Sequence, residues 1–228
     1  MNFVAALLVV AAYLIGSFPT AYLVGKANGI DLRKVGSGNL GATNVLRTIG
    51  WKAGLVVYVV DMAKGVLPVV LFPSLASVAK GWPWGVVFGI AAIIGHVKPI
   101  FLLGKGGGKG VATASGVFLG LAPIPALVAF VVFVAVTSIS RYVSLGSLIG
   151  AVSLVTAMWF QEGTFSALFI VSAIITAFVF YTHRANISRL RSGTESKIGR
   201  ASKNSFDKVD ATEDTVSQLS SDASRDRA

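Results

Sequence analysis

The sequence predicts an all-α protein that crosses a lipid membrane several times. Of its 228 residues, 54% are hydrophobic and only 13% are charged, and the mean hydropathy is +0.74. A soluble domain of this size would carry about twice that charged fraction. Apolar stretches long enough to cross ~30 Å of hydrocarbon recur along nearly the whole chain. Length and composition together therefore predict a bundle of membrane-spanning helices.

Short polar connections separate the apolar runs. The runs cover residues 3–24, 53–72, 83–103, 111–140, 143–161 and 164–182. No Lys or Arg precedes the first run, and no clear cleavage site follows it, so we expect a retained span rather than a signal peptide. The intervals leave no room for a soluble domain, so residues 1–198 are predicted to form one membrane-embedded domain. Residues 199–228 are rich in Ser, Asp, Lys and Arg and predict a disordered cytoplasmic tail.

The distribution of charge predicts the topology. Most basic residues lie in the connections 25–52, 104–110, 138–142 and 183–200. By the positive-inside rule these connections are cytoplasmic. The connections at 73–82 and 161–164 hold only Lys80 and Glu162, so we expect them outside. The run between 104–110 and Arg141 must then cross the membrane an even number of times.

This fourth run, 111–140, is long for one helix and short for two. Pro123 and Pro125 lie near its middle, where proline disrupts a helix. We therefore expect a tight hairpin of segments 111–122 and 124–140. The prediction is seven transmembrane helical segments, with the N-terminus outside and the C-terminus cytoplasmic. The alternative, one tilted helix and six spans, would break the charge rule twice.

Composition also excludes several kinds of chemistry. The net charge is +10, but the basic residues lie at span ends, which favours lipid headgroups or phosphorylated substrates over nucleic acid. Cysteine is absent, which removes thiol nucleophiles and disulfides. With two His and ten acidic residues, a zinc or two-metal centre is poorly supplied, and no metal or other cofactor is expected.

Three polar stretches carry the candidate site: SGNLGATNVLR (37–47), GKGGGKGVAT (104–113) and HRANISRLRSGTE (183–195). In the first, Ser37, Asn39 and Asn44 offer hydrogen bonds and Arg47 offers a fork suited to phosphate. Gly38 frees the backbone, so its N–H groups can point at an anion. An ordinary glycine-rich turn would explain Gly and Asn, but not so many polar side chains ending in Arg.

The second stretch is not a Walker P-loop, because Leu103 and Gly110 stand where that pattern needs Gly and Ser/Thr. Its bare amides at Gly107 and Gly108, with Lys109, still precede a helix N-terminus, which favours anions. A flexible basic loop touching anionic lipid is the alternative interpretation.

The third stretch follows the last span. His183 and Asn186 share a helix face at i, i+3, which a simple basic anchor does not need. Arg184 and Arg189 are phosphate candidates, although basic residues after a final span are also common anchors. Glu195 could neutralise one of the arginines and brace the segment.

Two further features lie within the spans. Asp61 and Lys64, also at i, i+3, are either functional or a pair that fixes helix packing. His96 is interpreted as the end of the third span.

Together the stretches resemble the bacterial acyl-phosphate:glycerol-3-phosphate acyltransferases, integral membrane enzymes of phospholipid synthesis. The matching patterns are Ser37-Gly38-Asn39-x-Gly41-Ala42-x-Asn44-x-x-Arg47, Gly107-Gly108-Lys109-Gly110-Val111-Ala112-Thr113 and His183-Arg184-x-Asn186-Ile187-x-Arg189-Leu190-x-x-Gly193-x-Glu195. Shorter similar segments surround Asp61, His96 and Arg141-Tyr142-Val143-Ser144. The match runs in order from about residue 15 to 198, with one extra glycine between His96 and Lys109.

The resemblance implies transfer of a fatty acyl group from acyl phosphate to the 1-hydroxyl of sn-glycerol 3-phosphate. The products would be 1-acylglycerol 3-phosphate (lysophosphatidic acid) and phosphate. The site would lie on the cytoplasmic face of the bacterial inner membrane, with no covalent acyl-enzyme. A soluble acyl-phosphate-producing enzyme is an expected partner, along with membrane lipid.

The resemblance distributes roles over the three stretches. We expect catalytic roles for Ser37, Arg47, Lys109, His183 and Asn186. We expect substrate-binding roles for Gly38, Asn39, Asn44, Gly107, Gly108, Gly110, Arg184, Arg189 and Glu195. His183 is a candidate base, although nearby cations disfavour its protonated form, and the donor phosphate could instead accept the proton. A transporter or flippase for a phosphorylated molecule is the alternative function, and it would require access to both faces.

Overall fold

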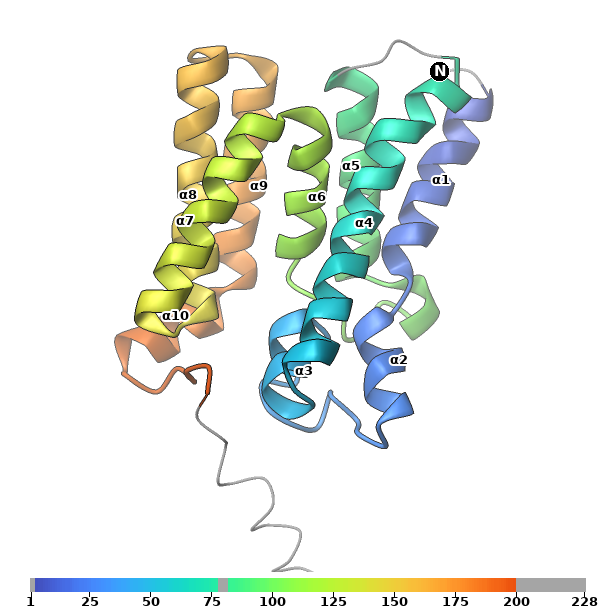
Figure 1. Ribbon diagram of the computed structural model, residues 1–228. Helices are drawn as coiled ribbons and strands as arrows, with labels where there is room; N and C mark the ends of the chain where they lie inside the picture. Colours follow the sequence, from blue (N-terminus) through green and yellow to red (C-terminus); the bar gives the residue numbers. More distant parts are fainter. Residues whose placement is uncertain (1–2, 78–81, 200–228) are drawn as a thin grey trace, which may run out of the picture.

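The computed structural model describes residues 3–77 and 82–199, without the side chain of Trp82, as a helical bundle (Figure 1). Its helices are α1 (Phe3–Ser17), α2 (Thr20–Ala27), α3 (Ala42–Thr48), α4 (Trp51–Leu75), α5 (Trp82–Val97), the 3-10 turn η1 (Ile100–Leu102), α6 (Val111–Leu121), α7 (Pro123–Ser140), α8 (Val143–Glu162), α9 (Ala167–Thr182) and α10 (Arg184–Arg191). The predicted tail falls almost wholly outside the described residues.

Helices occupy all seven predicted segments. Five helical stretches in the described chain are long and apolar enough to cross a membrane, or six if the bent pair α9–α10 counts as one span. The short apolar helix α6 falls below that length. The predicted break in the fourth run is confirmed: α6 ends at Leu121 and α7 begins at Pro123. Ala122 between them has φ of −146° and ψ of 75°, outside the helical region that a following proline disfavours.

The first run differs from the prediction of one uninterrupted helix. It breaks at Phe18 and Pro19, so α1 and α2 are separate helices. Proline has no N–H to continue the helical ladder. The connection 25–52 is also not all loop, because it contains the short helix α3.

Helix α6 lies at the centre of the bundle. In Figure 1, α1, α4 and α5 lie on one side of it, and α7, α8 and α9 on the other. Val117 and Phe118 of α6 are fully buried in the main hydrophobic core, where residues of α4, α5, α7, α8 and α9 pack around them. Large apolar side chains on the outer faces of α1, α4 and α7 are exposed, as expected for helices that face lipid.

Glycines bring two helix pairs into backbone contact. A Cβ on Gly65 of α4 would overlap the Thr113 carbonyl of α6, and a Cβ on Gly95 of α5 would overlap the Tyr13 carbonyl of α1. Small residues allow this close approach between membrane helices. The loops carrying the three polar stretches lie together at one end of the bundle, beside α2, α3 and α10 (Figure 1).

Candidate active site

The first polar stretch is held in shape by Asn44. Its Nδ2 donates to the carbonyls of Leu32 and Val35, at 3.0 and 3.1 Å, and its Oδ1 accepts the Ser37 N–H at 3.0 Å. The residue is only 1% exposed, so its amide is fully used by the protein. Its contacts therefore do not support the predicted substrate contact. Asn44 instead positions the backbone around Ser37.

Ser37 and Asn39 face the same polar space from the folded loop. Gly38, between them, has φ of 69°, in the left-handed region that glycine adopts without strain. The Asn39 N–H donates weakly to Ser37 Oγ, at 3.5 Å. This turn leaves both side chains on the cavity lining.

The glycine stretch packs against the end of α5 and brings Lys109 into the site. Gly110, with φ of 87°, caps the N-terminus of α6. Lys109 Nζ donates to Asn186 Oδ1, and the Lys109 carbonyl accepts from Thr182 Oγ1 at 3.1 Å. Burial, reinforced by the nearby charge of Arg189, lowers the pKa of Lys109 to about 8. An arriving anion would stabilise the protonated amine.

His183 lies at a 60° bend between α9 and α10. Its Nδ1 lies 2.8 Å from the Val179 carbonyl. Since a carbonyl only accepts, Nδ1 carries the proton, and neutral His183 has its lone pair on Nε2. Burial and the charge of Lys109 lower the pKa of His183 to about 4. The imidazole is therefore neutral at physiological pH.

Glu195 joins the third stretch to the rest of the site. Its carboxylate accepts from Ser144 Oγ at 2.9 Å, Asn186 Nδ2 at 2.7 Å and Arg189 Nε at 2.6 Å. Burial raises its pKa, but the hydrogen bonds from Asn186, Arg189 and Ser144 outweigh it and hold the pKa below its ordinary value. The predicted bracing role is confirmed. These contacts leave little of the carboxylate for the predicted substrate binding.

Arg47 reaches the same carboxylate from α3. Its Nη2 lies 3.7 Å from Glu195 Oε1 and donates to the Ser196 carbonyl at 2.6 Å. Its Nε is buried and has no hydrogen-bond partner within the described chain. A buried unpaired donor is costly, and a bound anion would supply its partner.

Arg184 is separated from this network. It is exposed, donates to the Tyr181 carbonyl at 3.0 Å and covers the Tyr181 ring. With Arg189 it faces only the outer part of the site.

Two polar cavities meet at the three stretches. The open cleft, of about 610 Å³, is lined by Ser37, Gly38, Asn39, Gly107, Gly108, Lys109, Arg184, Asn186 and Arg189, among others. The inner cavity, of about 90 Å³, is lined by Ser37, Asn39, Asn44, Arg47, Lys109, Gly110, His183, Asn186 and Glu195, among others. Ser37, Asn39, Lys109 and Asn186 line both. The structure thus brings together residues far apart in the sequence.

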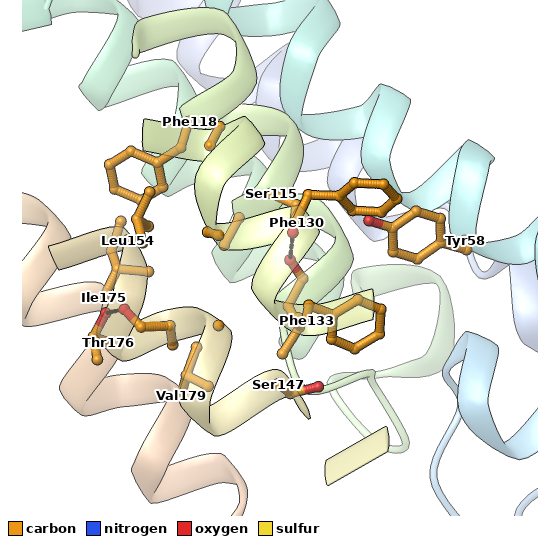
Figure 2. Close-up of a pocket in the computed structure, with 16 residues that line it drawn as sticks. Tyr58, Ser115, Phe118, Phe130, Phe133, Ser147, Leu154, Ile175, Thr176 and Val179 are labelled. Carbon is orange, nitrogen blue, oxygen red and sulfur yellow. Dashed lines mark hydrogen bonds between the residues drawn. The ribbon is translucent and has the colours of Figure 1, made fainter. Parts of the chain in front are cut away.

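An apolar cavity of about 70 Å³ adjoins the inner cavity. The two share the lining residues Tyr58, Val111, Phe133 and Ser147. Figure 2 shows Tyr58 and Phe130 on one side of this apolar cavity and Leu154 and Ile175 on the other. Sequence reasoning missed these residues, because each is an ordinary member of an apolar helix.

No group of three or more His, Cys, Asp or Glu side chains that could hold a metal occurs in 3–77 and 82–199. The fold and the site define a multi-pass integral membrane protein with a cationic site beside an apolar cavity.

Comparison with known proteins identifies the family. The glycerol-3-phosphate acyltransferase family model matches residues 6–193. The glycerol-3-phosphate acyltransferase of Trichlorobacter lovleyi is 47% identical and covers 83% of this chain and 95% of its own, and that of Chlorobaculum tepidum is 40% identical, covering 86% and 97%. The chain belongs to the glycerol-3-phosphate acyltransferase family.

A solved relative agrees with this assignment. The crystal structure of PlsY, an integral membrane glycerol 3-phosphate acyltransferase in its glycerol 3-phosphate form, is 38% identical, with a TM-score of 0.77 over 86% of this chain and 96% of that one. A second structure of that protein is its lysophosphatidic acid form, with a TM-score of 0.75.

Proposed function

We propose that this enzyme transfers a fatty acyl group from acyl phosphate to the 1-hydroxyl of sn-glycerol 3-phosphate. The products are 1-acylglycerol 3-phosphate and inorganic phosphate. The observation that carries the proposal is the junction of two polar cavities, rich in Lys and Arg, with an apolar cavity. Such a junction suits two phosphate-bearing reactants of which one has an aliphatic chain.

The cavities suggest how the substrates divide. The inner cavity shares four lining residues with the apolar cavity, so it suits the phosphate head of the acyl phosphate, near Arg47. The open cleft suits the water-soluble glycerol 3-phosphate, near Arg184. Lys109 and Asn186 line both polar cavities and would lie where the reactants meet.

Charge is the first contribution of the site. Both reactants are anions and repel each other, whereas Arg47, Lys109 and Arg189 surround the carboxylate of Glu195, and the other carboxylate on the inner cavity, Asp61, is paired with Lys64. The excess positive charge offsets the repulsion and stabilises negative charge that develops on the acyl oxygen and the leaving phosphate.

The proposed chemistry is direct transfer. The glycerol hydroxyl oxygen attacks the acyl carbonyl carbon, the bond from this carbon to the bridging phosphate oxygen breaks, and phosphate leaves with the bonding electrons. The hydroxyl proton passes to the phosphate. His183, neutral with its lone pair on Nε2, would orient the hydroxyl; a group of pKa about 4 is a weak base at pH 7.

His183→Gln tests this assignment. We expect it to raise KM for glycerol 3-phosphate while keeping a substantial part of kcat, since an orienting amide can replace an orienting imidazole. Loss of kcat by about 10³-fold at saturating substrate would instead support general-base catalysis by His183.

The proposal also includes a membrane topology. We infer seven membrane segments with the N-terminus outside and the site on the cytoplasmic face of the bacterial inner membrane. The clustering of the basic loops at one end of the bundle supports this orientation. Residues 1–198 would form the single membrane domain, and a soluble enzyme that makes acyl phosphate would supply the donor at this face.

The deciding experiment uses purified protein, acyl phosphate and glycerol 3-phosphate, with phosphate release and the lipid product both measured. We expect release that requires both substrates. Acyl-CoA serves as the comparison donor. Equal or better transfer from acyl-CoA would overturn the donor assignment, and no release above the protein-free control would overturn the reaction.

A further inference from the structure

A second group of charged residues lies within the membrane helices, and its members Asp61 and His96 border the inner cavity. Asp61 and Lys64 of α4 are 2% and 4% exposed, and Lys64 Nζ lies 2.5 Å from Asp61 Oδ1. Ionisable groups at membrane depth are costly and need a partner. The structure shows the i, i+3 contact, which was one of the two interpretations of these residues.

The pair ties three other helices together. Thr20 Oγ1, in the first turn of α2, donates to Asp61 Oδ1 at 3.1 Å. Lys64 Nζ donates to the Phe18 carbonyl at 2.6 Å, at the break between α1 and α2. Thr113 of α6 is fully buried, and its Oγ1 donates to the Asp61 carbonyl at 3.0 Å. The start of α6, two residues after Lys109, is therefore anchored to α4.

His96 connects the pair to the glycine stretch. It is buried near the end of α5, with Nδ1 3.9 Å from Asp61 Oδ1. The Gly108 N–H donates to the His96 carbonyl at 3.1 Å. A Cβ on Gly108 would overlap His96 Nε2, and a Cβ on Gly107 would overlap the carbonyls of His96 and Val97. The imidazole thus fills the space that Gly108 leaves open, and the backbone of α5 fills the space beside Gly107.

We propose that Asp61 and His96 are positioning residues that hold the stretch 107–110, and through it Lys109, against the substrate phosphate. The glycine at 108 is required for its contact with the His96 ring, not only for the approach of a substrate. The proposal rests on the proposed function, since it assigns a support to the same site.

The stretch 107–110 needs a neighbouring group to hold its shape. Consecutive glycines have high backbone entropy and do not hold one shape by themselves. The buried His96 ring, with Nδ1 3.9 Å from Asp61 Oδ1, offers the loop a packed surface, and the His96 carbonyl fixes Gly108 by accepting its N–H. Lys109 follows one residue later, so a small shift of the loop displaces its Nζ from Asn186.

The test is a cycle of substitutions at 96 and 108. Asn carries its amide near the position of Nδ1 and lacks the far edge of the ring, whereas Gln reaches the position of Nε2. Gly108→Ala alone is expected to lower kcat/KM about 100-fold, chiefly through KM for glycerol 3-phosphate, because the new methyl displaces the loop. In the His96→Asn background the same change is expected to cost less than about 5-fold, because room has been made. In the His96→Gln background the full loss should return.

Two readouts separate the inference from the function. Kinetics in the phosphate-release assay show whether a change acts on KM or on kcat. The Tm of thermal unfolding in detergent without substrate reports how well the loop packs. Gly108→Ala should lower Tm by about 5 °C alone and with His96→Gln, but not with His96→Asn. Ser172→Ala, which removes a buried hydroxyl bonded within its own helix, is the control and should leave KM unchanged.

The outcomes are distinct. Recovery with Asn but not Gln in both readouts supports the proposal. An equal loss from Gly108→Ala in all three backgrounds overturns it, because the glycine would then serve the substrate alone. Wild-type protein that releases no phosphate refutes the proposed function, and the Tm cycle then decides the contact between His96 and Gly108.

Discussion

Two buried carboxylates of this protein have opposite surroundings. Asp61, inside the bundle, faces one lysine from its own helix, while Glu195, at the polar end, faces arginines from α3 and α10 with Lys109 nearby. The first cluster pairs one anion with one cation. The second leaves cations in excess, as a site for phosphate requires. Asp61 also lines the inner cavity, but its charge is balanced by Lys64, so the excess positive charge of the site lies around Glu195.

The largest effect is expected from breaking the Asp61–Lys64 ion pair. Asp61→Asn should lower the free energy of unfolding by about 3–5 kcal/mol, because Lys64 remains buried with no counter-charge. Thermal and chemical unfolding in detergent measure it. The double change Asp61→Asn with Lys64→Met should recover a large part of the loss. If the single change leaves stability intact, the pair is not a structural ion pair.

Next in size is removal of an excess cation. Lys109→Met should lower kcat/KM by about 100- to 1,000-fold with little loss of stability, because it removes a donor to developing charge and a buried repulsion at once. Steady-state kinetics and thermal unfolding are the measurements. Lys105→Met, at an exposed lysine of the same loop, is the control. A loss of Tm as large as that of Asp61→Asn would contradict the contrast between the clusters.

The excess charge should also appear in the pH profile. Because the pKa of Lys109 is about 8, kcat/KM should fall above that pH, by about tenfold per pH unit if the charged amine is required. Glu195 raises the pKa of Lys109, so Glu195→Gln should move the fall to lower pH. Lys109→Arg should move it out of the measured range. A profile that stays flat to pH 10 in the wild-type enzyme would argue against a role for the Lys109 charge.

The smallest effect is expected from removing one of the several hydrogen-bond donors to Glu195. Ser144→Ala removes one of three donors to Glu195, and Asn186 and Arg189 remain. We expect about 1 kcal/mol of lost stability and about a twofold change in kcat/KM. Unfolding and kinetic measurements on the single variant suffice. A loss of activity above tenfold would show that Ser144 does more than hold Glu195.

Local patterns predicted much of the fold. The break at Ala122 followed from Pro123 and Pro125, because it depends on neighbours in the chain. The i, i+3 spacing of Asp61 and Lys64 made their contact one of two interpretations, and the structure shows it. The break at Phe18 was missed, although Pro19 was its signal. At this break the Phe18 carbonyl accepts a hydrogen bond from Lys64 of α4, a residue far from it in the sequence.

Site residues were harder to interpret than to find. The sequence drew attention to Asn44 and Glu195, but residue type alone does not separate a substrate contact from a brace. That distinction depends on which partners the fold supplies, such as the Leu32 carbonyl for Asn44 and Ser144 for Glu195. His96 was interpreted only as the end of a span, because its contacts with Asp61 and Gly108 join distant segments.

The shortness of α6 has a consequence for the lipid product. With 11 residues the helix is about 16 Å long at 1.5 Å per residue, and Figure 1 shows its lower end nearer the middle of the bundle than those of α4 and α7. In the proposed reaction, an acyl carbonyl beside Lys109 then sits below the bilayer surface. Drawing its chain into water would cost about 0.8 kcal/mol per methylene. In this reaction glycerol 3-phosphate enters the site from the water, and the acyl chain of the product stays within the bilayer.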